Sequence, residues 1–452
     1  MYRDQAGGVS ASPASGLPLD IAVVGSGISG LSAAWLLAKR HRVTLFEADN
    51  RIGGHSHTVD VAGIPVDTGF IVYNEQTYPN LTAMLRHLSV ASTSTEMSFA
   101  VSLDGGGYEY SGSGLRGLFA QKRNLLRPRF WTMLRELLRF YREAPGDLAG
   151  LRDESLDTYL NRAGYSAAFR EDHLYPMAAA IWSSPALGIR DYPAAAFIAF
   201  CQNHALLQTG KRPPWHTVQG GSRSYVQALR EQFGGMVRTC TPVYQITREL
   251  AGATLHTAAG AERFDHVVIA AHADQALAML AQPDEAERAL LSKFSYAPNH
   301  AVLHSDLRLM PQRRRVWSAW NFLQGSDTGD GPAVTYWMNR LQQLGTPVPL
   351  LVTLNPNIPP DPALVHWQGT YAHPLFDAAA IAAQRRLWAL QGRHNTWFCG
   401  AYFGAGFHED GLQAGLAVAE QLGGVHRPWH VAEPSGRIHV HPHQPVLSAA
   451  LA

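Results

Sequence analysis

The stretch that decides the fold is Ile21-Ala-Val-Val-Gly25-Ser26-Gly27-Ile28-Ser29-Gly30, continued by Leu45-Phe-Glu47-Ala48 and Arg51-Ile-Gly53-Gly54-His55. Residues 21–24 are apolar and predict a buried parallel strand, and apolar positions 31, 34, 35 and 38 predict a helix directly after the glycine turn. A second predicted strand, residues 43–46, ends in an acid about twenty residues after the motif. This order predicts a dinucleotide-binding Rossmann unit.

Each glycine of the motif has a separate role in such a unit. Gly25 permits the sharp turn, Gly27 leaves room for a pyrophosphate, and Gly30 lets the helix pack closely on the strand. The phosphates would bind the free N–H groups at the start of the helix, and Glu47 would accept the ribose hydroxyls. Glycine turns also occur for purely structural reasons, but the flanking strand, helix and acid complete the context. The motif does not distinguish NAD from FAD.

The continuation of the motif carries a family resemblance. The run 47–54, followed by Val66-Asp-Thr-Gly69-Phe70, resembles the flavin amine oxidase superfamily, which includes monoamine and polyamine oxidases, protoporphyrinogen oxidase and carotenoid (phytoene) desaturases. The resemblance implies FAD as the cofactor. It also implies an α/β fold in which a Rossmann-type, glutathione-reductase-like FAD-binding domain is interleaved with an α+β substrate domain, as in monoamine oxidases.

The C-terminal region resembles the last FAD-binding motif of the same superfamily. In the run 397–415 a strand and a glycine would reach the FAD, and a helix N-terminus would stabilise the anionic reduced flavin. Earlier in the chain, Val243 would meet the adenine through its backbone. The FAD-binding residues that the motifs together imply are Gly25, Ser26, Gly27, Ile28, Ser29, Gly30, Glu47, Ala48, Arg51, Gly53, Gly54, His55, Gly69, Phe70, Val243, Gly400, Glu409, Gly411 and Leu412.

Length and composition are those of a globular chain. The 452 residues are 46% hydrophobic, which is enough for two intertwined domains. A formal charge of +1 does not suggest a nucleic-acid partner. Three widely separated cysteines favour a reducing compartment and no structural metal, so we expect a cytoplasmic protein. Residues 1–18 lack the pattern of a signal peptide, and no apolar run is long enough to span a bilayer.

The motifs divide the chain into interleaved segments, and local patterns predict strands at 242–246 and 333–337 and a hairpin around 104–107. We expect a flexible N-terminus at 1–18 and an FAD-binding domain built from 19–95, 216–290 and 391–428. The substrate domain would combine 96–215 and 291–390. Residues 429–452 are expected to form a disordered tail, and its histidines (His439, His441 and His443) are not expected to bind a metal because no acid or cysteine completes a site.

Aromatic residues are dense in the predicted substrate domain and predict an apolar tunnel. A buried tryptophan or histidine is more often an ordinary core residue than a ligand contact. The candidates for substrate contact are Trp182, Trp320, Tyr336, Trp337 and Phe407.

Residues 121–143 alternate basic residues with leucine and aromatic residues, which predicts a basic amphipathic helix. Such a helix can lie on an anionic membrane, and the protein would then be peripheral at the inner membrane surface. The alternative is a helix that covers the core with its apolar face and exposes its basic face to water.

At a finer level the chain resembles bacterial oxidoreductases related to the flavin desaturase of furan fatty acid synthesis and to the oxidase domain of plant cyclopropane fatty acid synthases. This resemblance implies hydride transfer from an unsaturated or methyl-branched fatty acyl chain to flavin N5, with a lipid methyltransferase as a possible partner. Desaturation also needs a base. The candidates for this base, by motif position, are Tyr73, His408 and Glu409. His55 and His57 follow the glycine pair and lie near the flavin by motif position, but they can equally be ordinary polar loop residues.

Two other functions remain open. The first is a flavin amine oxidase, but such enzymes often hold a water near flavin N5 with a lysine, and only Lys293 is available after Lys211. In addition, Phe407 stands where amine oxidases carry a tyrosine of their aromatic cage. The second is a flavoprotein without net redox turnover, either a lipid isomerase or a partner protein of a lipid methyltransferase. His373 and Cys399 are candidates for covalent flavin attachment.

Overall fold

The computed structural model describes residues 17–151, 154–182, 186–204, 206–208, 213–325 and 332–441. The expected flexible segment 1–18 therefore lies almost wholly outside the described residues. The first half of the molecule is built on a five-stranded parallel sheet with the order β10-β2-β1-β14-β20. Its strands are β1 (Asp20–Val24), β2 (Arg42–Phe46), β10 (Met236–Arg238), β14 (His266–Ile269) and β20 (Thr396–Phe398).

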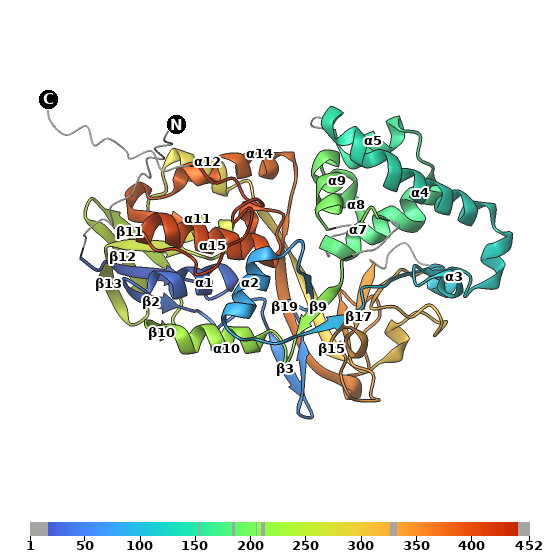
Figure 1. Cartoon of the computed structure of the whole chain (residues 1–452), viewed down its shortest axis with the longest axis horizontal. Helices are drawn as coiled ribbons and strands as arrows, with labels where there is room; N and C mark the ends of the chain where they lie inside the picture. Colours follow the sequence, from blue (N-terminus) through green and yellow to red (C-terminus); the bar gives the residue numbers. More distant parts are fainter. Residues whose placement is uncertain are drawn as a thin grey trace, which may run out of the picture.

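The helices α1 (Ile28–Leu37) and α15 (His408–Gly423) pack against each other beside this sheet (Figure 1). Two glycines of α15 make the close approach possible. A β-carbon on Gly411 would lie 2.8 Å from Ser29 Oγ, and one on Gly415 would collide with the carbonyl oxygen of Ser29. The N-termini of the first and last long helices of this half are thereby brought to the same end of the sheet.

The remaining elements of this half surround the sheet. A three-stranded antiparallel sheet is formed by β11 (Gln245–Glu249), β12 (Gly252–Thr257) and β13 (Gly260–Phe264). We expected a strand at 242–246, but β11 begins three residues later because Pro242 has no N–H to donate to a ladder. The helices are α2 (Pro79–His87), α10 (Arg223–Gln232), α11 (Ala273–Met279), α12 (Glu285–Leu291) and α14 (Ala378–Leu387).

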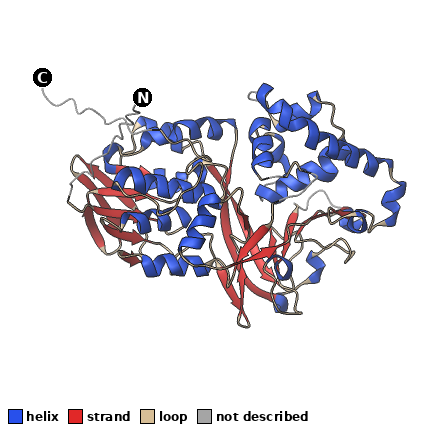
Figure 2. Ribbon diagram, viewed as in Figure 1, coloured by secondary structure: helices blue, strands red, loops and turns tan. Residues whose placement is uncertain are grey.

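The second half is built on a seven-stranded mixed sheet with the order β19-β15-β18-β17-β16-β7-β8. In Figure 2 a group of helices lies on one side of this sheet. Its strands are β7 (Phe99–Leu103), β8 (Tyr108–Ser111), β15 (Ser295–His304), β16 (Trp320–Leu323), β17 (Ala333–Trp337), β18 (Leu351–Leu354) and β19 (Val365–Leu375). The expected hairpin around 104–107 joins β7 to β8.

Short strands and one small helix connect the two halves. A hairpin is formed by β3 (Thr58–Val61) and β4 (Ile64–Asp67), and a three-stranded sheet by β5 (Tyr73–Asn74), β9 (Trp215–Val218) and β6 (Ser92–Thr95). The helix α13 (Met338–Leu341) follows β17. The Rossmann-type half and the mixed α+β half confirm the expected fold class.

The helical group begins with α3 (Leu115–Leu118) and the 3₁₀ turn η2 (Lys122–Leu126). The single helix expected over 121–143 instead starts at Pro128, because a residue that precedes proline is disfavoured in the helical conformation and Arg127 is extended. None of the helices in the described part of the chain is long and apolar enough to cross a membrane. The other helices of the helical group are α4 (Pro128–Asp147), α5 (Leu156–Arg162), α6 (Ala167–Phe169), α7 (Tyr175–Trp182), α8 (Ala186–Arg190) and α9 (Ala194–Asn203).

The segment 429–441 corrects the expectation of a disordered tail. Trp429 stacks on Trp35 of α1 with ring centroids 5.9 Å apart, and Ile438 is buried. Arg437 donates to Asp410 at 2.5 Å, so the segment covers the start of α15. His443 and residues 442–452 lie outside the described residues.

Candidate functional site

A single cavity of about 1490 Å³ joins the two halves of the molecule. It begins at the loop after β1, passes the N-terminus of α15, and continues between the seven-stranded sheet and the helices α4, α7 and α9. This volume is larger than that of an ordinary small-molecule site, which is about 300–1,000 Å³. The cavity can therefore hold a large cofactor and a substrate together.

The N-terminus of α1 has the features of an anion-binding site. No side chain caps its N-terminus, so its first N–H groups face the cavity without a side-chain partner. A β-carbon on Gly27 would meet no atom within 4 Å, whereas one on Gly30 would collide with the carbonyl oxygen of Gly25. Gly27 thus leaves a space on the cavity wall, and Gly30 is needed for packing.

Glu47 lies at the end of β2 and is held in place by hydrogen bonds. Its carboxylate accepts from the backbone N–H of Ser26 at 3.0 Å, from the Ser26 hydroxyl, and from the backbone N–H of Asp49 at 2.9 Å. It lines the cavity beside Ala48 and close to the segment 241–244, which includes Val243. A carboxylate in this position is suited to accept the two hydroxyls of a ribose.

These features fit FAD. The uncapped helix and the space at Gly27 would hold the pyrophosphate, and Glu47 the adenosine ribose. Gly53, Gly54, His55, Gly69, Phe70 and Gly400 continue the lining from there toward the start of α15. Most of the residues that match the sequence motifs therefore lie along one wall of the cavity.

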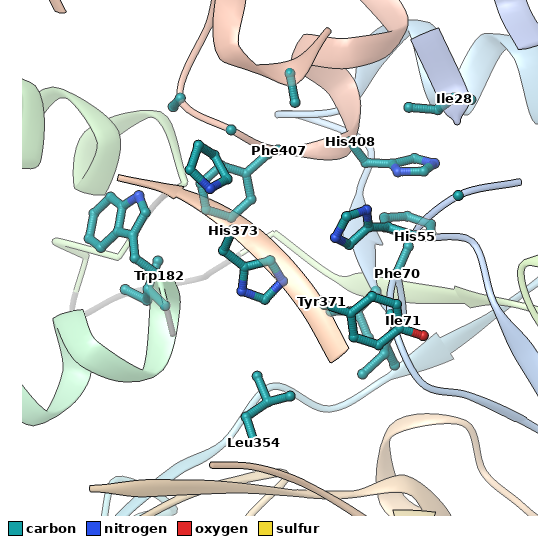
Figure 3. A pocket seen from close by; sticks show the side chains of 18 of the residues that line it. Ile28, His55, Phe70, Ile71, Trp182, Leu354, Tyr371, His373, Phe407 and His408 are labelled. Atoms are coloured by element: carbon teal, nitrogen blue, oxygen red, sulfur yellow. The ribbon is translucent and has the colours of Figure 1, made fainter. Parts of the chain in front are cut away.

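Four histidines surround the part of the cavity between the two halves. His55 has ring centroids 5.6 Å from His373 and 6.2 Å from His272, and His408 stacks on Phe70 at 3.9 Å. Figure 3 shows His55, His373 and His408 grouped around the cavity, with Trp182 on the opposite side. Within the described part of the chain, no cluster of potential ligands has the arrangement of a metal site.

Burial keeps these histidines neutral. Desolvation, together with the neighbouring imidazoles, lowers the pKa of His55 to about 3, and desolvation lowers the pKa of His408 to about 3 and that of His373 to about 4. His408 Nε2 lies 2.8 Å from the hydroxyl of Tyr225, while His55 Nε2 has no hydrogen-bond partner among the described residues. A neutral imidazole has a lone pair that can accept a proton, but burial at these positions disfavours the charged form that would result.

The far arm of the cavity is apolar and aromatic. Trp182 lies 4.5 Å from Phe200, which stacks on Phe407 at 4.8 Å and on His204 at 3.9 Å. Its other walls carry Met97, Phe99, Leu134, Leu137, Tyr141, Met177, Ile181, Trp320, Tyr336 and Leu354. The described lining contains no lysine, and its carboxylates are Glu47 and Glu96. Lys293 is exposed and lies outside it.

Several expected site residues lie outside the lining. The Tyr73 hydroxyl lies 2.6 Å from Ser92 Oγ, and the Glu409 carboxylate accepts from the backbone N–H groups of Asn80 and Leu81. Glu409 thereby caps α2, and it and Tyr73 are not available as bases. The FAD candidates Gly30, Arg51, Gly411 and Leu412 and the attachment candidate Cys399 are also absent from the lining.

Trp337 corrects the expected set of substrate contacts. Neighbouring residues of a strand point to opposite faces, so Tyr336 faces the cavity while Trp337 packs at 5.5 Å from Trp317 in a separate cluster. Trp182, Trp320, Tyr336 and Phe407 do line the cavity.

Sequence reasoning missed the way in which the histidines combine. His272, His373 and Tyr371 come from segments far from the glycine motif, and no spacing connects them to His55. One signal was present: Tyr371 and His373 are two residues apart in β19, so they share a face of the strand. The Tyr371 hydroxyl also forms hydrogen bonds with Thr68 Oγ1 at 2.7 Å and with His57 Nδ1 at 2.9 Å.

Fold and site together define a two-domain FAD-binding oxidoreductase. Residues 28–355 match the model of the family described as flavin containing amine oxidoreductase. The chain belongs to this family, and the expectation of a flavoprotein oxidoreductase that uses FAD is confirmed at the family level.

Individual relatives are distant. A protein of Mycobacterium tuberculosis named as the flavin-containing monoamine oxidase AofH is 28% identical over 263 residues, 56% of each chain, so the match spans about half the length of this curated relative. The fatty acid isomerase of P. acnes has a similar fold, with a TM-score of 0.62, 15% identity, and coverage of 88% of this chain and 97% of that one. The cyclohexylamine oxidase of Brevibacterium oxydans gives a TM-score of 0.61, 18% identity, and coverage of 90% and 99%.

Proposed function

We propose that the protein removes a hydride from an unsaturated or methyl-branched fatty acyl chain and thereby desaturates it. The observation that carries this proposal is the apolar far arm, which leads from the histidines to α4. Its described lining contains no lysine, and its carboxylate, Glu96, is paired with Arg340. An acyl chain gains from burial in such an arm about 0.8 kcal/mol per methylene group.

The charges of the arm weigh against an amine substrate. A cationic amine in a buried site needs a carboxylate or an aromatic cage. Glu47 is at the ribose position, and Glu96 is half-exposed and paired with Arg340 at 2.6 Å. The pKa values of His55, His272, His373 and His408 are all lowered, so these histidines are neutral and supply no charge that would attract or repel a substrate.

FAD supplies the hydride acceptor when it is bound. The protein would hold the acyl chain against it, exclude water with the aromatic wall, and accept the one proton that the neighbouring carbon loses as the double bond forms. We assign this proton to a neutral imidazole, with His408 as the first candidate because it lies at the start of α15 and bonds Tyr225. His55 is the second candidate because its Nε2 has no partner among the described residues.

The substrate must carry an activated C–H bond. An allylic carbon, next to an existing double bond, is a better hydride donor than an isolated methylene group. A methyl-transfer reaction on a membrane lipid is the kind of step that would produce a branched substrate, which supports a lipid methyltransferase as a partner. The P. acnes structure, titled as a fatty acid isomerase, supports the compatibility of this fold with an acyl chain.

The test is anaerobic mixing of the FAD-loaded protein with candidate substrates, followed by the flavin absorbance. Bleaching by unsaturated or methyl-branched acyl chains, with a new double bond detected by mass spectrometry, is the expected result. Bleaching by amines alone would overturn the proposal and establish the amine oxidase alternative. A shifted double bond without bleaching would instead identify an isomerase.

A further inference from the structure

Five of the fourteen large apolar side chains that are exposed in the described residues come from one short segment. Leu115, Leu125, Leu126, Trp131 and Leu138 all lie within 24 residues of sequence, in α3, η2 and α4. Leu126 is 87% exposed and Leu138 56%. We call these five side chains the α3–α4 patch. It lies at the end of the molecule farthest from the five-stranded sheet (Figure 1).

Contacts between its elements make the patch continuous. Trp131 Nε1 donates to the carbonyl oxygen of Leu125 at 2.9 Å, which fixes α4 to η2. Phe119, directly after α3, has its ring 5.6 Å from that of Trp131. Trp131 and Leu138 are seven residues apart and lie on the same side of α4. These contacts join η2 to α4 and bring the end of α3 beside them, so the patch residues lie on three neighbouring elements.

The same surface is basic. Residues 115–138 contain six basic residues and one acidic residue, Glu136. Arg129 is paired with Asp172 and Glu171, and Arg135 lies 3.9 Å from Glu136, so the cations without an ion pair in the described part of the chain are Arg116, Lys122, Arg123 and Arg127. Arg116 and Lys122 are exposed, and neither forms an ion pair with a carboxylate in the described part of the chain. Apolar side chains with cations beside them match the surface of an anionic bilayer, where each lysine or arginine contributes about 1 kcal/mol.

The cavity opens at this patch. Leu138 is exposed and yet lines the cavity, together with Ser113, Leu118, Leu134 and Leu137. An acyl chain that leaves a bilayer beneath α4 would enter the apolar arm without crossing water. The bilayer surface and the apolar arm therefore meet at one place.

We propose that the α3–α4 patch docks the protein on an anionic phospholipid bilayer and admits an acyl chain directly from it. The admission of the chain rests on the proposed function, whereas the docking does not. The patch residues insert below the headgroups while Arg116 and Lys122 bind the lipid phosphates. Screening by salt weakens the second contribution.

The test is flotation of the FAD-loaded protein with vesicles of phosphatidylcholine alone or with phosphatidylglycerol added. We expect binding only to the anionic vesicles, and binding at least about tenfold weaker for Leu126→Ser and for the pair Arg116→Glu and Lys122→Glu. The matched controls are Leu250→Ser, at an exposed leucine in the other half, and the pair Arg230→Glu and Lys293→Glu, which changes the net charge equally. The controls should bind like the unchanged protein.

Activity separates the two proposals. Leu126 and Lys122 do not line the cavity, so Leu126→Ser should reduce flavin bleaching by vesicle lipid but not by a detergent-dispersed acyl substrate. Suppose that the protein binds anionic vesicles, that Leu126→Ser abolishes this binding, and that no lipid bleaches the flavin. This result would uphold docking and overturn the proposed function. Equal binding by the patch variants and the controls would overturn docking. A dimer that Leu126→Ser dissociates would also overturn it, because the patch would then join two copies of the chain.

Discussion

Gly27 and Gly30 lie in the same turn, but an added methyl group meets different surroundings at each. At Gly27 it would enter the space assigned to the pyrophosphate, and the backbone there (φ −61°) accepts any residue. Gly27→Ala should therefore leave the thermal unfolding of the apoprotein unchanged and weaken FAD binding at least about tenfold, or about 1.4 kcal/mol.

Gly30→Ala is the contrasting variant. Its methyl group would collide with the carbonyl oxygen of Gly25, so the apoprotein itself should lose about 1–3 kcal/mol of unfolding free energy. Thermal unfolding without FAD and titration with FAD measure the two effects separately. Equal losses of apoprotein stability in both variants would contradict the assignment of the space at Gly27.

His204 predicts an acid-dependent stability. Burial lowers its pKa to about 3 in the folded chain, while an unfolded histidine takes up a proton near pH 6.5. Below pH 6.5 the unfolded state therefore binds more protons than the folded state. The contribution of neutral, buried His204 to the unfolding free energy is complete above that pH and is lost as the pH falls. The loss is at most about 1.4 kcal/mol per pH unit.

His204→Phe keeps the stacking on Phe200 and removes the titrating group. We expect the unfolding free energy of the apoprotein, from urea denaturation at pH 7, 6 and 5, to fall less steeply than in the unchanged protein. His426→Phe, at an exposed position, is the control and should leave the slope as it is. An unchanged slope in His204→Phe would contradict the buried neutral state.

At the residue scale, the sequence was informative wherever one motif fixed both spacing and chemistry. Gly27 and Glu47 lie on the cavity wall as expected because strand, turn and helix are consecutive. His408 and Glu409 are neighbours in sequence but lie on different sides of α15, one lining the cavity and one capping α2. Sequence position alone cannot distinguish these sides until the partner helix is known.

The start of α15 supplies the prediction at the scale of the element. Glu409 accepts hydrogen bonds from the backbone N–H groups of Asn80 and Leu81 and from the side chains of Asn80 and Gln413, at 2.9–3.0 Å. Glu409→Gln replaces an acceptor by a donor against these groups and should cost about 1–3 kcal/mol of unfolding free energy.

The rate of flavin reduction per bound FAD should remain within about twofold in Glu409→Gln, because this carboxylate does not line the cavity. His408→Asn is the matched variant at the adjacent position, and general-base loss there should lower the rate by about 10²–10⁴. Stopped-flow bleaching and thermal unfolding of both variants give the comparison. A large rate loss in Glu409→Gln would restore it as a candidate base.

Strands and helices were predicted best where one local pattern dominates. The strand at 333–337 and the hairpin around 104–107 occur as expected. The helix over 121–143 was divided by Pro128, a local signal that the amphipathic pattern obscured. The prediction that Trp337 contacts the substrate was wrong. Which face of a strand points into a cavity depends on the sheet that the strand joins, and the strand's own sequence does not show this.

The segment 429–441 gives a prediction at the scale of the whole molecule. Its Arg437 neutralises Asp410, which is fully buried at the start of α15. A chain ending at Pro428 should lose at least about 3–5 kcal/mol of unfolding free energy, because it leaves this carboxylate without its cation and exposes Trp35. A chain ending at His441 is the control and should unfold like the full chain. Chemical denaturation of both truncations measures the difference, and equal stability would contradict the contacts of this segment.

The order of the five-stranded sheet has a consequence for biosynthesis. β1 is made early, yet the residues of β14 that pair with it lie 245 positions later, and α1 packs on α15, which is completed only near residue 423. When the glycine motif leaves the ribosome, β14 and α15, against which β1 and α1 pack, have therefore not yet been synthesised. The nascent chain must keep α1 and its buried tryptophan protected through most of translation. Flavin loading is therefore expected to follow the synthesis of α15, because the cavity wall at the start of that helix is absent until then.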